Sequence, residues 1–119
     1  MVKEVSTEQD FNDVLDQASQ NNSLVVVDFF TSWCGPCKVL GPLFNDVADS
    51  FEGKSVVFIK VNCETLDELA ENYDIASIPT MKFLVDKTVV HTHSGLASKD
   101  ELSNMVDKYL DALSGDKKE

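Results

Sequence analysis

The chain has 119 residues, and its 21 acidic side chains outnumber the ten basic ones to give a net charge of −11 at pH 7. All ten basic residues are lysines, so the arginine fork that reads guanine is missing and nucleic acid is not an expected partner. The longest apolar run, residues 24–27, falls far short of the roughly 18–20 residues that span a bilayer, which leaves a single globular domain over residues 1–119 with no membrane partner.

The first elements are predicted from a cap and from apolar spacing. Residues 3–5 form a weak, short strand. Thr7 followed by Asp10 resembles a capping box, and the helix after it carries apolar side chains every three or four positions until the polar turn at 20–23. Residues 24–30 are apolar on both alternating faces except at Asp28, which is typical of a buried parallel strand.

The next helix is predicted from an apolar stripe over residues 39–51, in which the four-residue steps begin at Val39. Pro42 lies inside this stripe, where it removes one hydrogen bond and is expected to kink the helix. Gly53 is a suitable stop.

The second half of the chain continues with a buried strand at 56–61, a short helix around 66–73, and a hairpin of two strands, 81–85 and 89–93. Ser98 caps a last helix, and the small, charged tail 114–119 is expected to be frayed. This order of elements predicts an α/β fold with a central mixed sheet of about five strands flanked by four helices.

The chemistry concentrates in residues 33–38, Trp-Cys-Gly-Pro-Cys-Lys, at the junction of the first long strand and the stripe-bearing helix. Two cysteines at this spacing beside a strand–helix–strand pattern are typical of a thiol–disulfide redox pair. At a helix start, Cys34 meets unpaired N–H groups and the positive end of the helix dipole, which lower its pKa and favour the attacking thiolate. Gly35 is expected to let the backbone turn tightly, and Pro36 suits the first helical turn. Cys37, almost one turn later, is placed to resolve a mixed disulfide intramolecularly.

A structural zinc site is the alternative for the same two cysteines. Zinc needs four ligands, and the only other candidates are Cys63, His91 and His93. The two histidines share one face of a predicted edge strand, where we expect them to face solvent. The redox interpretation is therefore favoured, and no metal is expected.

Asp28 is the second anomaly, because an ionised carboxylate is costly inside a strand buried on both faces. Burial should raise its pKa, and a raised carboxyl group near the helix start could exchange a proton with Cys37. Lys60 on the adjoining strand is a candidate charge partner. The plain alternative, a solvated Asp at the end of a strand, stays open at this point.

Together these residues resemble the thioredoxin family. The family pattern matches residues 27–38, Val-Asp-Phe-Phe-Thr-Ser-Trp-Cys-Gly-Pro-Cys-Lys, and continues with the helix proline at Pro42, the lysine at Lys60, the Ile-Pro-Thr at 78–80 and a glycine at Gly95. The resemblance covers nearly the whole chain in the family's order and spacing. It implies the thioredoxin fold.

The resemblance also implies the roles in the site. Cys34 would be the nucleophile and Cys37 the resolving thiol of a redox-active disulfide, with Asp28 as buried acid or base tuned by Lys60. Pro79 would follow a cis peptide bond. An uncharged lip would bind an extended substrate segment, and its residues are Trp33, Gly35, Pro36, Ile78, Pro79 and Gly95.

The function that this resemblance implies is general reduction of protein disulfides by dithiol–disulfide exchange. The partners would be disulfide-containing client proteins and a thioredoxin reductase, which would pass on electrons from NADPH, so that no cofactor is bound to the chain itself. Two alternatives stay open: an oxidase or isomerase of a secretory compartment, disfavoured by Gly-Pro between the cysteines, and a binding module that uses only the lip.

The place of action is expected from the cysteines and from the start of the chain. An odd set of three cysteines suits a reducing compartment, and residues 1–4 lead straight into polar sequence, so the expected location is the cytoplasm. An organellar protein that has lost a transit peptide is the other option. The chain is expected to be a monomer, in which Cys63 is a buried small side chain or, less favoured, a regulatory thiol that links an oxidised dimer.

Three positions depart from the family pattern. The hairpin turn at 85–88, Val-Asp-Lys-Thr, lacks the usual glycine, which puts its turn type in question. Phe30 stands where Trp or Tyr is common, and Cys63 lies where family members vary.

Overall fold

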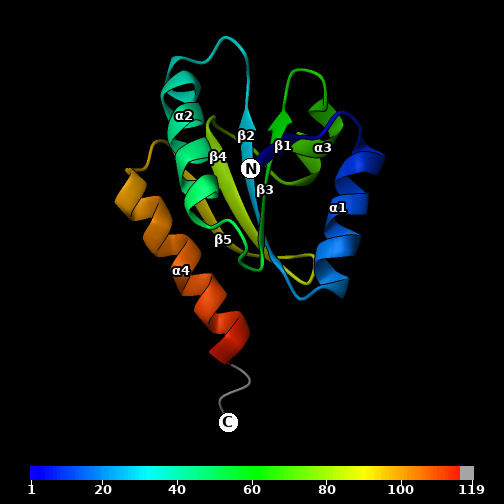
Figure 1. Ribbon diagram of the computed structural model, residues 1–119. Coiled ribbons are helices and arrows are strands. Elements are labelled where there is room, and N and C mark those ends of the chain that lie inside the picture. The colour runs from blue at the N-terminus through cyan, green and yellow to red at the C-terminus, as the bar shows by residue number, and fades with distance from the viewer. Residues whose placement is uncertain (116–119) are drawn as a thin grey trace.

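The computed structural model describes residues 1–115 as one five-stranded sheet between two pairs of helices (Figure 1). The strands are β1 (Val2–Glu4), β2 (Leu24–Phe30), β3 (Val56–Asn62), β4 (Thr80–Val85) and β5 (Thr88–Ser94). The helices are α1 (Glu8–Gln20), α2 (Gly35–Ser50), α3 (Asp67–Asn72) and α4 (Lys99–Gly115). Within residues 1–115, no helix has the length and apolar character that crossing a membrane requires.

The sheet has the strand order β1-β3-β2-β4-β5. Strands β1, β3 and β2 are parallel, whereas β4 runs antiparallel to β2, and β5 antiparallel to β4. This confirms the predicted mixed sheet and places β2 at its centre. The carboxyl ends of β2 and β3 therefore meet the start of β4 at one edge, and the loops that follow or precede these strands gather there.

Each face of the sheet has its own apolar core, because successive side chains of a strand point to opposite faces. Leu24 and Val26 of β2 pack with side chains of α2 and α4, among them Leu40, Phe44 and Leu102. The alternate β2 residues pack with side chains of α1 and α3 and are Val25, Val27 and Phe29. Both faces are covered, which explains why nearly every residue of β2 is apolar.

Two predicted helix caps are confirmed. The Thr7 hydroxyl accepts a hydrogen bond from the Asp10 N–H at 3.0 Å, and the Asp10 carboxylate accepts one from the Ser6 N–H. At the start of α4, Ser98 and Glu101 form a reciprocal capping box, with N···O distances of 3.0 and 2.8 Å.

The predicted boundaries and faces differ from the structure in several details. Strand β1 covers Val2–Glu4, one residue earlier than expected. Helix α4 extends to Gly115, so the first two residues of the supposed frayed tail are helical, and the rest of that tail lies outside the described residues. Val39 is 60% exposed, because the buried face of α2 is centred on Leu40, Phe44 and Val47, and Val39 lies beside this face.

The hairpin turn between β4 and β5 forms without glycine. Asp86 and Lys87 both adopt positive φ, 50° and 67°, which is the pattern of a type I′ turn. The Ser19 hydroxyl donates to the Asp86 carboxylate, and the Lys87 ammonium lies 2.6 Å from a carboxylate oxygen of Asp16. Contacts from α1 therefore hold the turn in a conformation that the two residues rarely adopt alone.

Candidate active site

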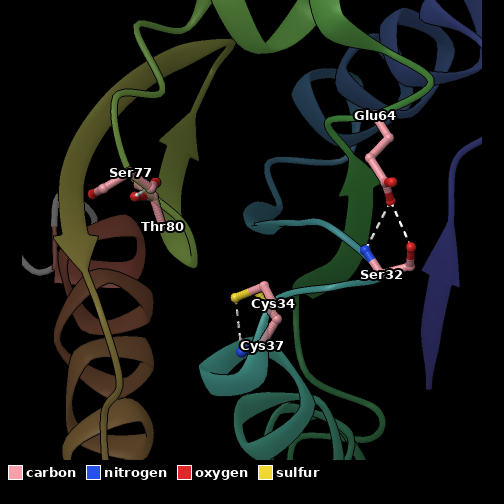
Figure 2. Close-up of a disulfide and its surroundings, with 6 residues drawn as sticks. All are labelled: Ser32, Cys34, Cys37, Glu64, Ser77 and Thr80. Carbon is pink, nitrogen blue, oxygen red and sulfur yellow. Dashed lines mark hydrogen bonds between the residues drawn. A yellow bond between two sulfur atoms is a disulfide. The ribbon is translucent and has the colours of Figure 1, made fainter.

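The two cysteines of the motif form a disulfide at the N-terminus of α2, with their Cα atoms 5.2 Å apart. Cys34 is the N-cap residue, and its sulfur accepts a hydrogen bond from the Cys37 N–H at 3.1 Å (Figure 2). The predicted position at a helix start is thus confirmed. An N–H group and the helix dipole face the Cys34 sulfur, and both favour negative charge on it.

The neighbours of the disulfide are exposed, although Cys34 and Cys37 themselves are buried. Trp33 is 69% exposed, and Gly35 and Pro36 are exposed in the first turn of α2. The expectation that Gly35 permits a tight turn is wrong: only Gly53 and Gly95 among the described glycines have positive φ, and a Cβ at Gly35 would meet no atom within 4 Å. A side chain at Gly35 would therefore point into open space.

Asp28 is buried, with 1% of its surface exposed, near the end of β2. By alternation it points to the sheet face that α2 covers, and its Oδ1 atom has no hydrogen-bond partner among residues 1–115. Burial raises its pKa to about 6, and the positive charge of Lys60 opposes part of that rise. The alternative of a solvated Asp at the end of a strand is therefore wrong.

Lys60 lies opposite Asp28 in the β2–β3 register, as predicted for a charge partner. It makes no ion pair within 4 Å in the described part of the chain. Its ammonium group instead lies 4.3 Å from the centre of the Phe30 ring. Lys60 and Cys37 line the same open hollow beside α2, so water can reach the surroundings of the resolving cysteine.

Residues 78, 79 and 95 form a wall of the site at the same end of the sheet as the disulfide, because the start of β4 pairs with the end of β2. The Ile78–Pro79 peptide bond is cis, as the resemblance implied, and Pro79 is buried while Ile78 is half-buried. The Gly95 N–H donates to the Pro79 carbonyl at 2.8 Å, and Gly95 has a φ of 88°. Thr80, the next residue, pairs with Phe29 of β2, so this wall lies at the end of the sheet where residues 31–34 follow β2. Figure 2 shows Ser77 and Thr80 on the opposite side of Cys34 from Glu64.

One contact was missed by the sequence reasoning. A carboxylate oxygen of Glu64 accepts hydrogen bonds from the Ser32 N–H at 2.8 Å and from the Ser32 hydroxyl at 2.7 Å (Figure 2). These bonds, with a smaller contribution from the Trp33 side chain, hold the pKa of Glu64 below its usual value. Glu64 follows β3 as Ser32 follows β2, so adjacency of the two parallel strands was the only signal available.

The zinc alternative lacks a ligand set. Among residues 1–115, no three His, Cys, Asp or Glu side chains lie together in a way that could hold a metal ion. The expectation that the two histidines face solvent is also wrong. Both are half-buried on the side of α4: the His91 ring stacks on Tyr109 with centroids 5.5 Å apart, and His93 Nε2 lies 2.9 Å from the Leu96 carbonyl.

Comparison with known proteins agrees with this geometry. The family model described as Thioredoxin matches residues 2–108. Thioredoxin from Mycoplasmoides gallisepticum is 41% identical over 77% of this chain and 90% of its own, and Thioredoxin H1 from Arabidopsis thaliana is 38% identical over 87% and 89%. The crystal structure of reduced Schistosoma mansoni thioredoxin superposes with a TM-score of 0.81 at 34% identity, covering 91% of this chain and 97% of that one. The chain belongs to the thioredoxin family.

Proposed function

We infer that the chain is a general protein-disulfide reductase that acts by dithiol–disulfide exchange. The single observation that carries this function is the Cys34–Cys37 disulfide at the start of α2 in a chain of the thioredoxin family. The structure holds the oxidised pair, which is the product of one reducing cycle. Reduction of this disulfide would regenerate the working dithiol.

The reaction proceeds in two exchanges. The Cys34 thiolate attacks one sulfur of a client disulfide; the client S–S bond breaks, one client thiolate leaves, and a mixed disulfide forms. Cys37 then loses its proton and attacks the Cys34 sulfur. The mixed disulfide breaks, the second client thiolate leaves, and the pair of electrons that the dithiol carried now resides on the client.

Asp28 is proposed to take the proton from Cys37 in the second exchange. It is buried on the sheet face that α2, the helix of Cys37, also covers, and its Oδ1 atom has no hydrogen-bond partner within residues 1–115. With a pKa of about 6, Asp28 is mostly ionised at neutral pH and can therefore act as a base. Lys60 is proposed to limit how far this pKa rises.

The client is proposed to bind across the disulfide, between Trp33 with the first turn of α2 and the wall of Ile78, Pro79 and Gly95. This lip carries no charged side chain, whereas the chain as a whole has a net charge of −11. An extended, apolar segment around a client disulfide suits such a surface better than an acidic one.

The activity is tested by reduction of insulin with dithiothreitol. We expect the wild-type chain to accelerate the reduction, and the Cys34→Ser/Cys37→Ser double variant to return it to the rate of dithiothreitol alone. Turbidity from the released insulin B chain is the measurement. If the wild type gives no acceleration, the chain is not a disulfide reductase. That result would favour the alternative that the chain is a binding module and uses only its lip.

The dithiol is proposed to be recharged by a thioredoxin reductase that draws electrons from NADPH.

We propose the cytoplasm as the place of action, because Cys63 is a free thiol in a chain whose other two cysteines exchange disulfides. Fractionation of cells that express the native protein checks this, and recovery in an organelle fraction would contradict it.

Cys63 is proposed to play a structural part in a monomeric protein. It is half-buried, and burial together with the charge of Asp28 raises its pKa to about 11. Its thiolate is therefore scarce at neutral pH, and attack on an oxidant is slow. In the Cys34→Ser/Cys37→Ser background, we expect a disulfide oxidant to yield a Cys63-linked dimer about a hundredfold more slowly at pH 7 than at pH 9, because the thiolate fraction of a group with a pKa of about 11 falls by that factor. Non-reducing gels measure this, with Cys63→Ser added as the control. Rapid dimer formation at pH 7 would instead support the regulatory thiol.

A further inference from the structure

The loop that carries the nucleophile is tied to the neighbouring loop by one side chain. Ser32 comes two residues before Cys34, and Glu64 accepts hydrogen bonds from both its N–H and its hydroxyl, at 2.8 and 2.7 Å. Figure 2 shows Glu64 reaching across from its own loop to Ser32, next to the disulfide. Glu64 makes no direct contact with the two cysteines in these hydrogen bonds.

The loop that supplies Glu64 is itself held in place. The Glu64 N–H donates to the Asn62 side chain at 2.9 Å, and the Cys63 N–H donates to the Phe30 carbonyl at 2.8 Å. Phe30 and Asn62 are paired across β2 and β3. The loop after β3 is thus anchored on the sheet, and Glu64 transfers this anchorage to the loop after β2.

We propose that Glu64 is a positioning residue for the disulfide-exchange reaction: its carboxylate holds the Ser32–Trp33 segment so that Cys34 stays at the N-terminus of α2 and the indole of Trp33 stays beside it. The inference rests on the proposed function. The effect runs through Ser32, since Cys34 caps α2 only while the residues before it enter the helix at the present angle. Glu64 is exposed, and its carboxylate could be solvated by water alone. Its two hydrogen bonds to Ser32 are therefore what keeps the carboxylate against this loop.

The test separates the hydrogen bonds of Glu64 from its charge. Glu64→Gln keeps an oxygen that accepts from both groups of Ser32 but removes the charge, whereas Glu64→Ala removes both. Glu68→Ala is the matched control, because it removes an exposed glutamate of α3 for which no bond to Ser32 is present. Ser32→Ala removes one of the two bonds.

We expect Glu64→Ala to lower kcat/KM for insulin reduction about three- to tenfold, because two hydrogen bonds to a charged group are lost at an exposed site. Glu64→Gln should recover most of the activity, Glu68→Ala should match the wild type, and adding Ser32→Ala to Glu64→Ala should cost less than it does in the wild type. If Glu64→Gln falls as far as Glu64→Ala, charge rather than position matters and the proposal is overturned. Equal rates for all variants also overturn it.

A second readout does not depend on activity. Trp33 is the sole tryptophan of the chain, so its time-resolved fluorescence anisotropy reports the motion of this loop directly. We expect faster local motion in Glu64→Ala than in the wild type, and wild-type behaviour in Glu64→Gln. Unchanged anisotropy in Glu64→Ala overturns the proposal even if the chain reduces insulin. If the wild type fails to reduce insulin but the anisotropy of Glu64→Ala is altered, the proposed function is rejected, whereas the role of Glu64 in holding the Ser32–Trp33 segment is supported.

Discussion

Replacing Cys37 with Ser is expected to turn the protein into a trap for its clients, whereas replacing Cys34 with Ser abolishes reaction with them. Either substitution should lower catalysed insulin reduction about a hundredfold or more, because the intramolecular second exchange or the first attack is lost. Only the Cys37→Ser variant should accumulate mixed disulfides. The two outcomes thus assign the roles of the two cysteines.

The structural reason for this asymmetry is the helix start rather than burial. Cys34 and Cys37 are almost equally buried in the oxidised state, at 5% and 6% exposure. The Cys34 sulfur, however, accepts the Cys37 N–H at the N-cap, where the helix dipole stabilises a thiolate, and Cys37 lies within the first turn of the helix. We therefore expect Cys34 to be the better nucleophile at neutral pH.

The measurement is mass spectrometry of the complexes formed with oxidised insulin. Both variants are made in a Cys63→Ser background, so that the remaining free thiol adds no mixed disulfides of its own. Adducts that form on Cys34→Ser and not on Cys37→Ser would reverse the two roles.

Features that depend on one element or on adjacent residues were predictable from the sequence. The caps at Thr7 and Ser98 are set by the residues that follow within one turn, and both form as expected. The raised pKa of Asp28 followed from a single carboxylate in a doubly buried strand. The match of residues 27–38 to a known family identified the fold and the disulfide.

Features that depend on how two elements meet were not predictable. Val39 belongs to the apolar stripe of α2 but is exposed, because the exact rotation of the helix on the sheet is decided by Leu40 and Phe44. His91 is half-buried because Tyr109 of α4 covers it. Glu64 contacts Ser32 although 32 residues separate them, since β2 and β3 end side by side. In each case the deciding partner lies on another element.

Asp28→Asn is expected to raise the free energy of unfolding relative to the wild type by more at pH 7 than at acid pH. The same substitution is expected to slow the second exchange. The pKa of Asp28 is about 6 in the folded chain, above its ordinary value of 3.8. The folded state therefore binds this proton more tightly than the unfolded chain does. Asp28 costs the fold least below pH ~4, where it is protonated in both states, and the cost grows as the pH rises towards 6.

The size of this effect follows from the two pKa values. A difference from 3.8 to about 6 corresponds to about 3 kcal/mol at pH 7. The free energy of unfolding of Asp28→Asn minus that of the wild type should therefore be about 3 kcal/mol more positive at pH 7 than at pH 3.5. Comparing the two pH values cancels the fixed cost of burying the amide. Urea unfolding at both pH values is the measurement.

Asp107→Asn is the matched control, because it removes one carboxylate at an exposed position of α4 and so separates burial from the change in net charge. If the two variants show the same pH dependence, burial of Asp28 is not the cause.

The rates of the two exchanges in Asp28→Asn test whether the buried carboxylate is needed for the reaction. Asparagine cannot accept the Cys37 proton, so resolution should slow more than the initial attack, and a mixed disulfide should accumulate in Asp28→Asn during insulin reduction. Acid quenching followed by mass spectrometry measures that species. Equal slowing of both exchanges would show that Asp28 acts on the site as a whole and not as the base for Cys37. If Asp28→Asn both raises the free energy of unfolding at pH 7 and accumulates a long-lived mixed disulfide, the buried charge destabilises the fold but is needed for proton transfer from Cys37.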